Sequence, residues 1–441
     1  AKVAVVDAER LQRLLPELAG GVEAPLVLAR DRVGGAVPAG VRRLVDLIGP
    51  PGGYETLPDT PAPDVELESD DLATIFYTSG TTGQSRGAFG THRNVATNLV
   101  NINFRAARAA VRRGDSWPPP APVAPRRQLL PLPFFHVTGF HSNLAPALAN
   151  GVTLVLMYKW DAEAALALIE GERIQALTLV PTQVWQLIDA AAAAEHDVSC
   201  VDTIGYGGAS AALELAGRVR ETFPAAYPGQ GYGATETSAL TAANSHEDMM
   251  ARPGSVGVAV PCCDLRVVAG DGLEAAVGEP GELWVSGPNI VLGYWNAPDA
   301  TASAFEDGWY RTGDIVRIDE EGFITVLDRA KDMLIRGGEN IYCVEIEDAL
   351  ASHPAVAEAA VVGVPDRVMG ELVGAVVRLR HGHVADPKML IAHAGARLAA
   401  FKVPTVLRLR TKTFPRNAAG KVVKRELREE LLHSLGQGAQ L

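Results

Sequence analysis

The residues best suited to do chemistry in this sequence lie in the stretch YTSGTTGQSRGAF, residues 77–89. Six consecutive positions carry only glycine or a hydroxyl side chain: Thr78, Ser79, Gly80, Thr81, Thr82 and Gly83. Glycines let backbone N–H groups approach a ligand, hydroxyls add donors, and Arg86 adds a positive charge behind them. This combination indicates anion binding, with phosphate as the usual ligand. Taken alone, the stretch is equally typical of a surface turn, and it lacks the Walker pattern G-x-x-x-x-G-K-[ST].

Five later stretches combine glycines with a hydroxyl, a carboxylate or a cation. In chain order they are GYGGAS (205–210), GQGYGATET (229–237), YRTGD (310–314), DRAKDMLIRGGENIYCVEIE (328–347) and PRNAAGKVVKREL (415–427). Together with the hydroxyl loop, and in this order, they resemble the motifs of the adenylate-forming (AMP-binding) superfamily, which includes acyl- and aryl-CoA synthetases, nonribosomal adenylation domains and beetle luciferases. The resemblance extends from about residue 70 to about residue 430.

The resemblance implies roles for the nucleotide-binding residues. The hydroxyl loop would hold the β- and γ-phosphates of ATP, with Arg86 where the family usually has lysine. The remaining roles would be as follows: Gly207, Gly208 and Ala209 beside the adenine and the acyl group, Tyr232 stacked on the adenine, Thr235 bonded to the α-phosphate, Glu236 on Mg²⁺, and Asp314 on the ribose hydroxyls with help from Arg329. Without the resemblance, the alternative for Asp314 is a turn carboxylate that accepts from its own backbone.

The resemblance also implies roles in acyl binding, domain movement and catalysis. His136 would gate the acyl pocket, although a histidine among phenylalanines is more often a core residue, and Trp185 would line that pocket or simply pack. The other implied roles are Lys331 as the hinge, Gly337, Gly338 and Glu339 along the pantetheine tunnel, and Lys421 on both the substrate carboxylate and the α-phosphate. We interpret Lys424 as a solvated cation at a helix start, and Cys343 as a packing variation with a reactive thiol as the alternative.

These roles predict an ATP-dependent acyl-CoA synthetase, an AMP-forming carboxylate–CoA ligase. It would activate a fatty or aromatic carboxylic acid as acyl-AMP, release pyrophosphate, and transfer the acyl group to coenzyme A. Three alternatives stay open: loading of a carrier protein, luciferase-type oxidation, and an inactive homologue that only binds nucleotide or acyl ligand. The apolar stretch LPFFHVTGF favours a fatty or aromatic acid over acetate.

The elements that position these motifs alternate between strands and helices. Strands are predicted at LATIFY, RQLLPL, GVTLVLM, ALTLV and VDTIGYG, with helices between them, one of them capped by Asp161. This alternation predicts an α/β fold with a parallel sheet, and ligands bind beyond the carboxyl ends of such strands. We therefore expect the hydroxyl loop, which follows LATIFY, to lie at that edge of the parallel sheet.

The pattern changes twice along the chain. Residues 1 to about 60 predict a β-α-β start, residues 255–328 predict short strands of a barrel-like part, and the chain from 329 onward predicts a small α+β domain. We expect a large domain at 1–328 and a small mobile domain at 329–441, with a hinge near 329–331. The family carries a longer segment before the phosphate loop than the 77 residues found here, so we expect the large domain to lack about its first ~100 residues.

Composition narrows the class further. Among 441 residues, 47% are hydrophobic, which supports a large core, and the net charge of −12 argues against a nucleic-acid partner. No apolar run is long enough for a transmembrane segment, and no signal peptide is evident. The four cysteines form no C-x-x-C pair, which excludes the usual zinc spacing and fits a reducing cytoplasm. A homodimer is one assembly state that the sequence allows.

Overall fold

The structure is a computed structural model that describes residues 2–18, 25–30, 37–61, 63–79, 85–118, 124–193, 196–209, 211–380, 382–416 and 421–436. Its contacts divide the chain into two compact units, Ala1–Leu67 and Glu68–Leu441. The loop residues Gly80, Thr81, Thr82 and Gly83 lie outside the described residues.

The first unit is a small parallel sheet with helices. Its strands pair in the order β1-β2-β3 and its elements are β1 (Ala4–Asp7), α1 (Ala8–Leu18), β2 (Leu26–Arg30), β3 (Val41–Arg43), α2 (Leu44–Ile48) and η1 (Pro51–Thr56). Leu11 of α1 packs on Leu26 and Leu28 of β2. The predicted β-α-β start is therefore confirmed.

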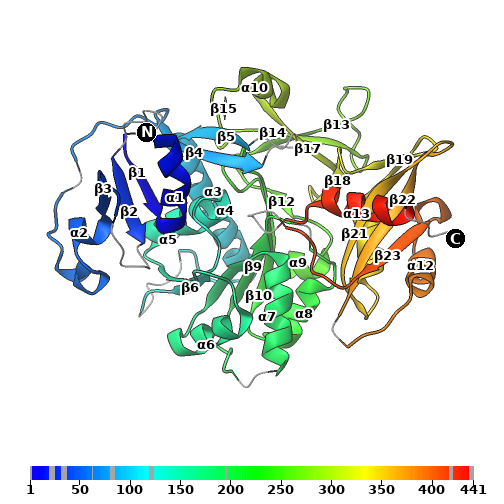
Figure 1. Ribbon diagram of the computed structural model, residues 1–441, viewed down its shortest axis with the longest axis horizontal. Coiled ribbons are helices and arrows are strands. Elements are labelled where there is room, and N and C mark those ends of the chain that lie inside the picture. The colour runs from blue at the N-terminus through cyan, green and yellow to red at the C-terminus, as the bar shows by residue number, and fades with distance from the viewer. Residues whose placement is uncertain are drawn as a thin grey trace. The chain divides into compact units, whose positions relative to one another are not determined.

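A seven-stranded sheet forms the centre of the second unit, with strand order β12-β11-β10-β9-β8-β6-β7 (Figure 1). The strands are β6 (Arg127–Leu130), β7 (Thr153–Leu156), β8 (Ala176–Leu179), β9 (Thr203–Gly207), β10 (Tyr227–Tyr232), β11 (Ala242–Ser245) and β12 (Val258–Ala259). The pairs from β7 through β10 are parallel, as the alternating pattern predicted, whereas β11 and β12 add antiparallel strands at one edge.

One face of this sheet is covered by helices that build the largest apolar core. The helices are α6 (Ala162–Glu172), α7 (Pro181–Ala193) and α8 (Leu215–Thr222), with α9 (Glu247–Ala251) nearby. The predicted cap is present, because the Asp161 side chain accepts from the Ala164 N–H at 2.9 Å. Ile204 and Tyr206 of β9 point into this core.

On the middle strands β8, β9 and β10, the opposite face of the sheet carries mainly small residues. Side chains alternate along a strand, so Gly205 and Gly207 of β9 share this face with Gly229 and Gly231, their register partners on β10. Four further helical elements belong to this part of the chain: α3 (His92–Arg112), α4 (Val137–Gly139), η2 (Phe140–Leu144) and α5 (Ala145–Asn150). Gln128 of β6 reaches η2 by donating to the Asn143 side chain at 2.5 Å. The glycines therefore leave room between the sheet and the helices on this face.

The strand before the hydroxyl loop does not belong to the parallel sheet. β4 (Leu72–Ser79) pairs antiparallel with β5 (Ser85–Thr91), and β5 pairs with β15 (Gly293–Tyr294). The prediction that LATIFY opens the parallel sheet is therefore wrong. A short apolar run indicates a buried strand but does not reveal its partner, and here β4 pairs antiparallel with β5, the next strand along the chain.

A second sheet follows with strand order β13-β14-β17-β16, and β18 pairs with β17. Its elements are β13 (Asp264–Val268), β14 (Gly281–Ser286), α10 (Pro298–Ala304), β16 (Phe305–Glu306), β17 (Trp309–Ile318) and β18 (Ile324–Arg329). These short antiparallel strands confirm the barrel-like part of the predicted α/β fold.

The last sheet has the order β20-β19-β22-β21, with β23 beside β22 (Figure 1). Its elements are β19 (Leu334–Arg336), β20 (Glu339–Ile341), α11 (Cys343–Ala351), β21 (Val356–Asp366), β22 (Gly370–Leu379), α12 (Pro387–Gly395), η3 (Ala400–Lys402), β23 (Val406–Arg410) and α13 (Lys424–Gly436). This is the predicted α+β pattern. The change of sheet falls directly after Arg329, where β18 ends. The division into 1–328 and 329–441 stays a prediction, since contacts group both parts in the second unit.

Candidate active site

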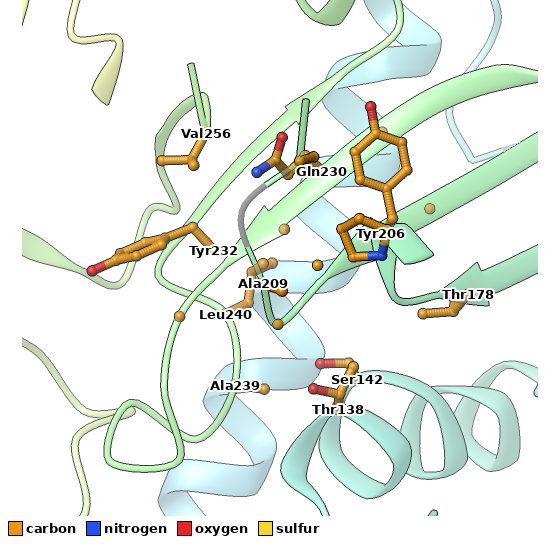
Figure 2. Close-up of a pocket in the computed structure, with 18 of the residues that line it drawn as sticks. Thr138, Ser142, Thr178, Tyr206, Ala209, Gln230, Tyr232, Ala239, Leu240 and Val256 are labelled. Atoms are coloured by element: carbon orange, nitrogen blue, oxygen red, sulfur yellow. The ribbon is translucent and has the colours of Figure 1, made fainter. Parts of the chain in front are cut away.

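A large cavity lies along β8, β9 and β10 and extends to their carboxyl ends. Figure 2 shows part of its lining, with Thr138 and Ser142 from α4 and η2 opposite Thr178 and the strand residues. Most of the predicted site residues within the described part of the chain line it: Thr78, Arg86, His136, Gly207, Gly208, Ala209, Tyr232, Thr235, Glu236, Asp314, Arg329, Lys331 and Lys421. Motifs that are far apart in the sequence therefore line the same cavity.

Tyr232, Asp314 and Arg329 form a connected group in this cavity. The Tyr232 hydroxyl donates to one Asp314 carboxylate oxygen at 2.6 Å, and the Arg329 Nε lies 2.8 Å from the other. Burial and the Asp314 charge raise the pKa of Tyr232 well above its usual value, so the hydroxyl stays protonated and donates. The same carboxylate raises the pKa of Arg329. The group holds an aromatic ring and a carboxylate in one orientation at the cavity wall.

Glu236 has a partner that sequence reasoning missed. The Tyr294 hydroxyl donates to the Glu236 carboxylate at 2.7 Å, and the Arg86 guanidinium lies 5.5 Å from the centre of the Tyr294 ring. Burial and the Glu236 charge raise the pKa of Tyr294. Tyr294 carried only a weak signal, an aromatic residue after a glycine in VLGYW, because its partner lies 58 positions earlier.

The turn that presents Glu236 requires an unusual backbone. Ser238 and Ala239 adopt positive φ angles of 53° and 104° although neither is glycine. A Cβ on Gly233 would lie 1.6 Å from the Ala239 carbonyl oxygen, so only glycine fits there. Such strain is stored where the surrounding structure demands it, and functional sites are common places for it.

The glycines of the GYGGAS motif have a structural reason of their own. A Cβ on Gly207 would lie 2.6 Å from the Gly231 carbonyl oxygen on β10, and Gly208 adopts a φ of 77°. Small side chains are therefore needed there for strand packing and for the turn, in addition to any ligand approach. Ala209 follows directly and faces the cavity (Figure 2).

Two residues of the hydroxyl loop can be described. Thr78 and Ser79 end β4, and the Thr78 hydroxyl donates to the Arg86 carbonyl oxygen at 3.5 Å across the hairpin. Arg86 lies on β5, the second strand of the hairpin, directly opposite Thr78 on β4. Arg86 is close to Thr78 because β4 and β5 pair in an antiparallel register.

Lys421 reaches the cavity from the C-terminal part of the chain. Burial lowers its pKa, the nearby Arg329 lowers it further, and Asp314 and Glu236 oppose these effects. Lys421 also acts electrostatically on His136, whose pKa is lowered mainly by burial. The His136 ring lies 3.4 Å from the Thr138 hydroxyl. The structure therefore brings Lys421, His136, Asp314 and Glu236 to one place.

Gly337 and Gly338 are not part of the cavity lining. They form the tip of the hairpin between β19 and β20, where Arg336 pairs with Glu339. Their φ angles of 60° and 89° are those of a two-residue turn that requires glycine or a similarly permissive residue. The pantetheine role of these glycines and of Glu339 stays a prediction.

Trp185 packs partly against the central core and meets the C-terminal part of the chain. The Arg380 guanidinium lies over its ring at 5.2 Å from the centre. Trp185 therefore packs against the core, makes a cation–π contact with Arg380, and also lines the cavity.

Two further interpretations can be judged. Cys343 is fully buried at the start of α11, and burial raises the pKa of its thiol, so packing rather than reactivity describes it. Lys424 is not a solvated cation: its Nζ lies 2.7 Å from the Glu347 carboxylate, and both side chains are largely buried. That interpretation was wrong because the buried partner lies on α11, far away in sequence.

Within the described ranges, no group of three or more His, Cys, Asp or Glu side chains could hold a metal on its own. Glu236, a buried carboxylate in the cavity, suits Mg²⁺, which is commonly bound through one or two carboxylates together with substrate phosphates. Across the described helices, none combines the length and apolarity that a bilayer span demands.

Comparisons with known proteins identify the family of this chain. Residues 1–295 match the family model described as AMP-binding enzyme, and residues 345–421 match the AMP-binding enzyme C-terminal domain. Feruloyl-CoA synthase from Amycolatopsis sp is 35% identical over 382 residues, 87% of this chain and 74% of that protein. Long-chain-fatty-acid--CoA ligase from Yersinia pestis is 36% identical over 363 residues, 82% of this chain and 62% of that protein.

A solved structure shows the same architecture. ATP-bound MatB from Rhodopseudomonas palustris superimposes with a TM-score of 0.80 and 29% identity, covering 98% of this chain and 79% of that one. The fold and site thus define an AMP-forming acid–thiol ligase. The chain belongs to the AMP-binding enzymes, the adenylate-forming superfamily that the motifs predicted, and to their acyl-CoA synthetase branch.

The Tyr232–Asp314 hydrogen bond provides a test of the nucleotide site. Tyr232→Phe keeps the ring and removes one donor from a buried carboxylate, so we expect the Kd for ATP to rise about tenfold, measured by titration calorimetry. Tyr158→Phe, on an exposed tyrosine, is the matched control and should leave the Kd unchanged. An unchanged Kd in Tyr232→Phe would show that Asp314 needs no orientation by this hydroxyl.

Proposed function

We propose that this chain is an ATP-dependent acyl-CoA synthetase that activates a fatty or aromatic carboxylic acid and transfers it to coenzyme A. The observation that carries the proposal is the convergence of Lys421 with Asp314, Glu236 and His136 on one cavity. The names of the relatives, one for an aromatic and one for a long-chain acid, support the same class of reaction.

The first half-reaction would join the acid to the nucleotide. A carboxylate oxygen of the acid attacks the α-phosphorus of ATP, the bond to the β-phosphate bridging oxygen breaks, and pyrophosphate leaves. Charge builds up on the phosphoryl oxygens, and Lys421 and the Thr235 hydroxyl would stabilise it. The loop Thr78–Gly83 and Arg86 would hold the leaving phosphates, and Asp314 with Arg329 would hold the ribose. Mg²⁺ held by Glu236 would neutralise part of the phosphate charge.

The second half-reaction would transfer the acyl group. The thiol of coenzyme A attacks the acyl carbon, the bond to the phosphate oxygen breaks, and AMP leaves. Lys331 would act as the hinge that brings Gly337 and Gly338 toward the pantetheine arm and takes Lys421 away. His136, which Lys421 influences electrostatically, would gate the acyl pocket. A reducing cytoplasmic location and a homodimeric state stay predictions from the sequence.

Acid-dependent exchange between ATP and pyrophosphate tests the proposal. Purified protein should exchange label when given an acid from a panel of fatty and aromatic acids, and should form an acyl-CoA when coenzyme A is added. Nucleotide binding without exchange on any acid would favour an inactive homologue. Exchange without acyl-CoA formation would instead favour a carrier-protein thiol as the acceptor.

Lys421→Ala separates the two half-reactions. Loss of one charge contact to the reacting groups should slow adenylation about 10²–10³-fold, measured from acid and ATP. Thioester formation from a pre-made acyl-adenylate and coenzyme A should stay near the wild-type rate. A variant that folds normally and is slowed equally in both assays would show that Lys421 is not specific to adenylation.

The protonation of Lys421 predicts a pH dependence of adenylation. Its pKa is lowered in the fold, so the charge is lost at a lower pH than for an ordinary lysine as the pH rises. The profile of kcat/KM against pH should therefore have a basic limb that moves to higher pH or disappears in Lys421→Arg, because guanidinium stays charged. A basic limb at the same pH in both proteins would assign it to another group.

A further inference from the structure

One face of helix α3 lines the cavity. Ile102, Arg105, Ala106 and Ala109 line the cavity at helical spacing. Ile102 packs with the Leu240 cluster near Tyr232, and Arg105 follows one turn later. Most side chains on this face are small and apolar, and Arg105 adds a positive charge to it.

Arg105 has no counterion in the described structure. No hydrogen bond or ion pair connects it to any described residue, whereas the neighbouring arginines of α3 are paired: Arg108 and Arg112 lie 2.7 and 2.8 Å from Asp248. Arg113 is likewise paired with Asp115 at 2.8 Å. The Asp248 and Asp115 carboxylates are thus already paired with other arginines. Surrounding protein lowers the pKa of Arg105, although part of its side chain stays accessible from the cavity.

A second polar group nearby also lacks a partner. The Nδ1 atom of His246 is buried without a hydrogen bond, and its ring stacks on Tyr227 at 4.6 Å between centres. His246 lines the same cavity, adopts a positive φ of 58°, and lies within the electrostatic influence of Arg105. Because buried polar groups in proteins normally have partners, each exception needs an explanation.

The cavity wall formed by β9 and β10 leaves space for the carbon chain of an acid substrate. Glycines 205, 207, 229 and 231 leave part of this sheet face without side chains, and the cavity lining continues along the strands to Tyr227 and Asp202. Tyr227 and Tyr232 end the same six-residue strand, so they are about 17 Å apart. A ligand that extends from Tyr232 along this strand would therefore meet His246, which stacks on Tyr227, at the other end of the strand.

Removing a guanidinium from water without pairing it raises the free energy of the folded protein, and a bound anion offsets this penalty. We propose that Arg105 and His246 form a specificity site for a second carboxylate on the acid substrate, so that the preferred substrates are dicarboxylic acids. One carboxylate is activated near Lys421 and the other is held by the guanidinium fork of Arg105, whose geometry matches a carboxylate. His246 donates or accepts a further hydrogen bond through Nδ1. This inference rests on the proposed function.

The experiment compares adipate, suberate and sebacate with the monomethyl ester of each, which has nearly the same shape and one charge fewer. For the diacid whose length fits, wild-type kcat/KM in pyrophosphate exchange should exceed that of its monoester by about 10- to 100-fold. Arg105→Met should remove this ratio while keeping exchange with the monoester. Arg105→Lys should keep part of it, since the charge remains but the fork is lost.

Arg112→Met is the matched control: it lies on the same helix outside the cavity lining, and Arg108 still pairs with Asp248. It should keep the wild-type ratio. Equal losses for diacid and monoester in Arg105→Met would assign Arg105 a purely structural role, and a wild-type preference for monoesters or long fatty acids would overturn the inference. Equal use of acids ending in a neutral amide would overturn the charge requirement.

The failure of the inference can be told from the failure of the proposed function. Exchange with monocarboxylic acids alone contradicts only the dicarboxylate site. If no acid supports exchange, calorimetry of suberate binding to the wild type and to Arg105→Met, each with AMP present, still tests the site. Loss of binding in the variant supports the inference, and equal or absent binding in both contradicts it.

Discussion

A buried carboxylate, Asp314, is the contact on which the arrangement of this site depends. It lies on β17 of the second sheet, accepts from Tyr232 on the central sheet, and pairs with Arg329 at the end of β18. Removing a charge from water is costly unless partners replace the solvent, so the two sheets are tied where both partners must reach one carboxylate. The charges of Arg329, Asp314 and Glu236 all act on Lys421: Arg329 lowers its pKa, and the two carboxylates raise it.

The polar groups around the cavity divide into those that are satisfied within the fold and those that are not. Glu236 has Tyr294, Asp314 has two donors, and Glu347 has Lys424. Arg105 and the Nδ1 of His246 lack such partners in the described structure. Satisfied groups give the site its rigidity, since their orientation is determined without a ligand. Groups without partners are where a ligand contributes most, because it removes a penalty that the empty site carries.

Glycine serves two purposes along the central sheet. Gly207 and Gly233 are required by the fold itself, because a Cβ would collide with a backbone oxygen of a neighbouring segment. Gly205 and Gly229 meet no such close contact, and the missing side chains leave open space above the strands. Glycine-rich motifs in this chain therefore cannot be read as ligand contacts position by position.

The sequence by itself determined the family, much of the order of strands and helices, and a set of motif residues that the structure places around the cavity. Those inferences rest on local patterns: the Asp161 cap, the apolar strands, and motifs in which glycine and hydroxyl residues are adjacent. Only the tertiary structure decided which distant segments meet. It placed β4 in an antiparallel hairpin, paired Lys424 with Glu347, and brought Tyr294 to Glu236 from 58 positions away. The reason is physical: periodicity and turn chemistry act over a few residues, whereas the partner of a buried charge is chosen by the packing of the whole chain. Among the residues that the structure describes, the same packing left Arg105 without a counterion, which no local pattern around it reveals.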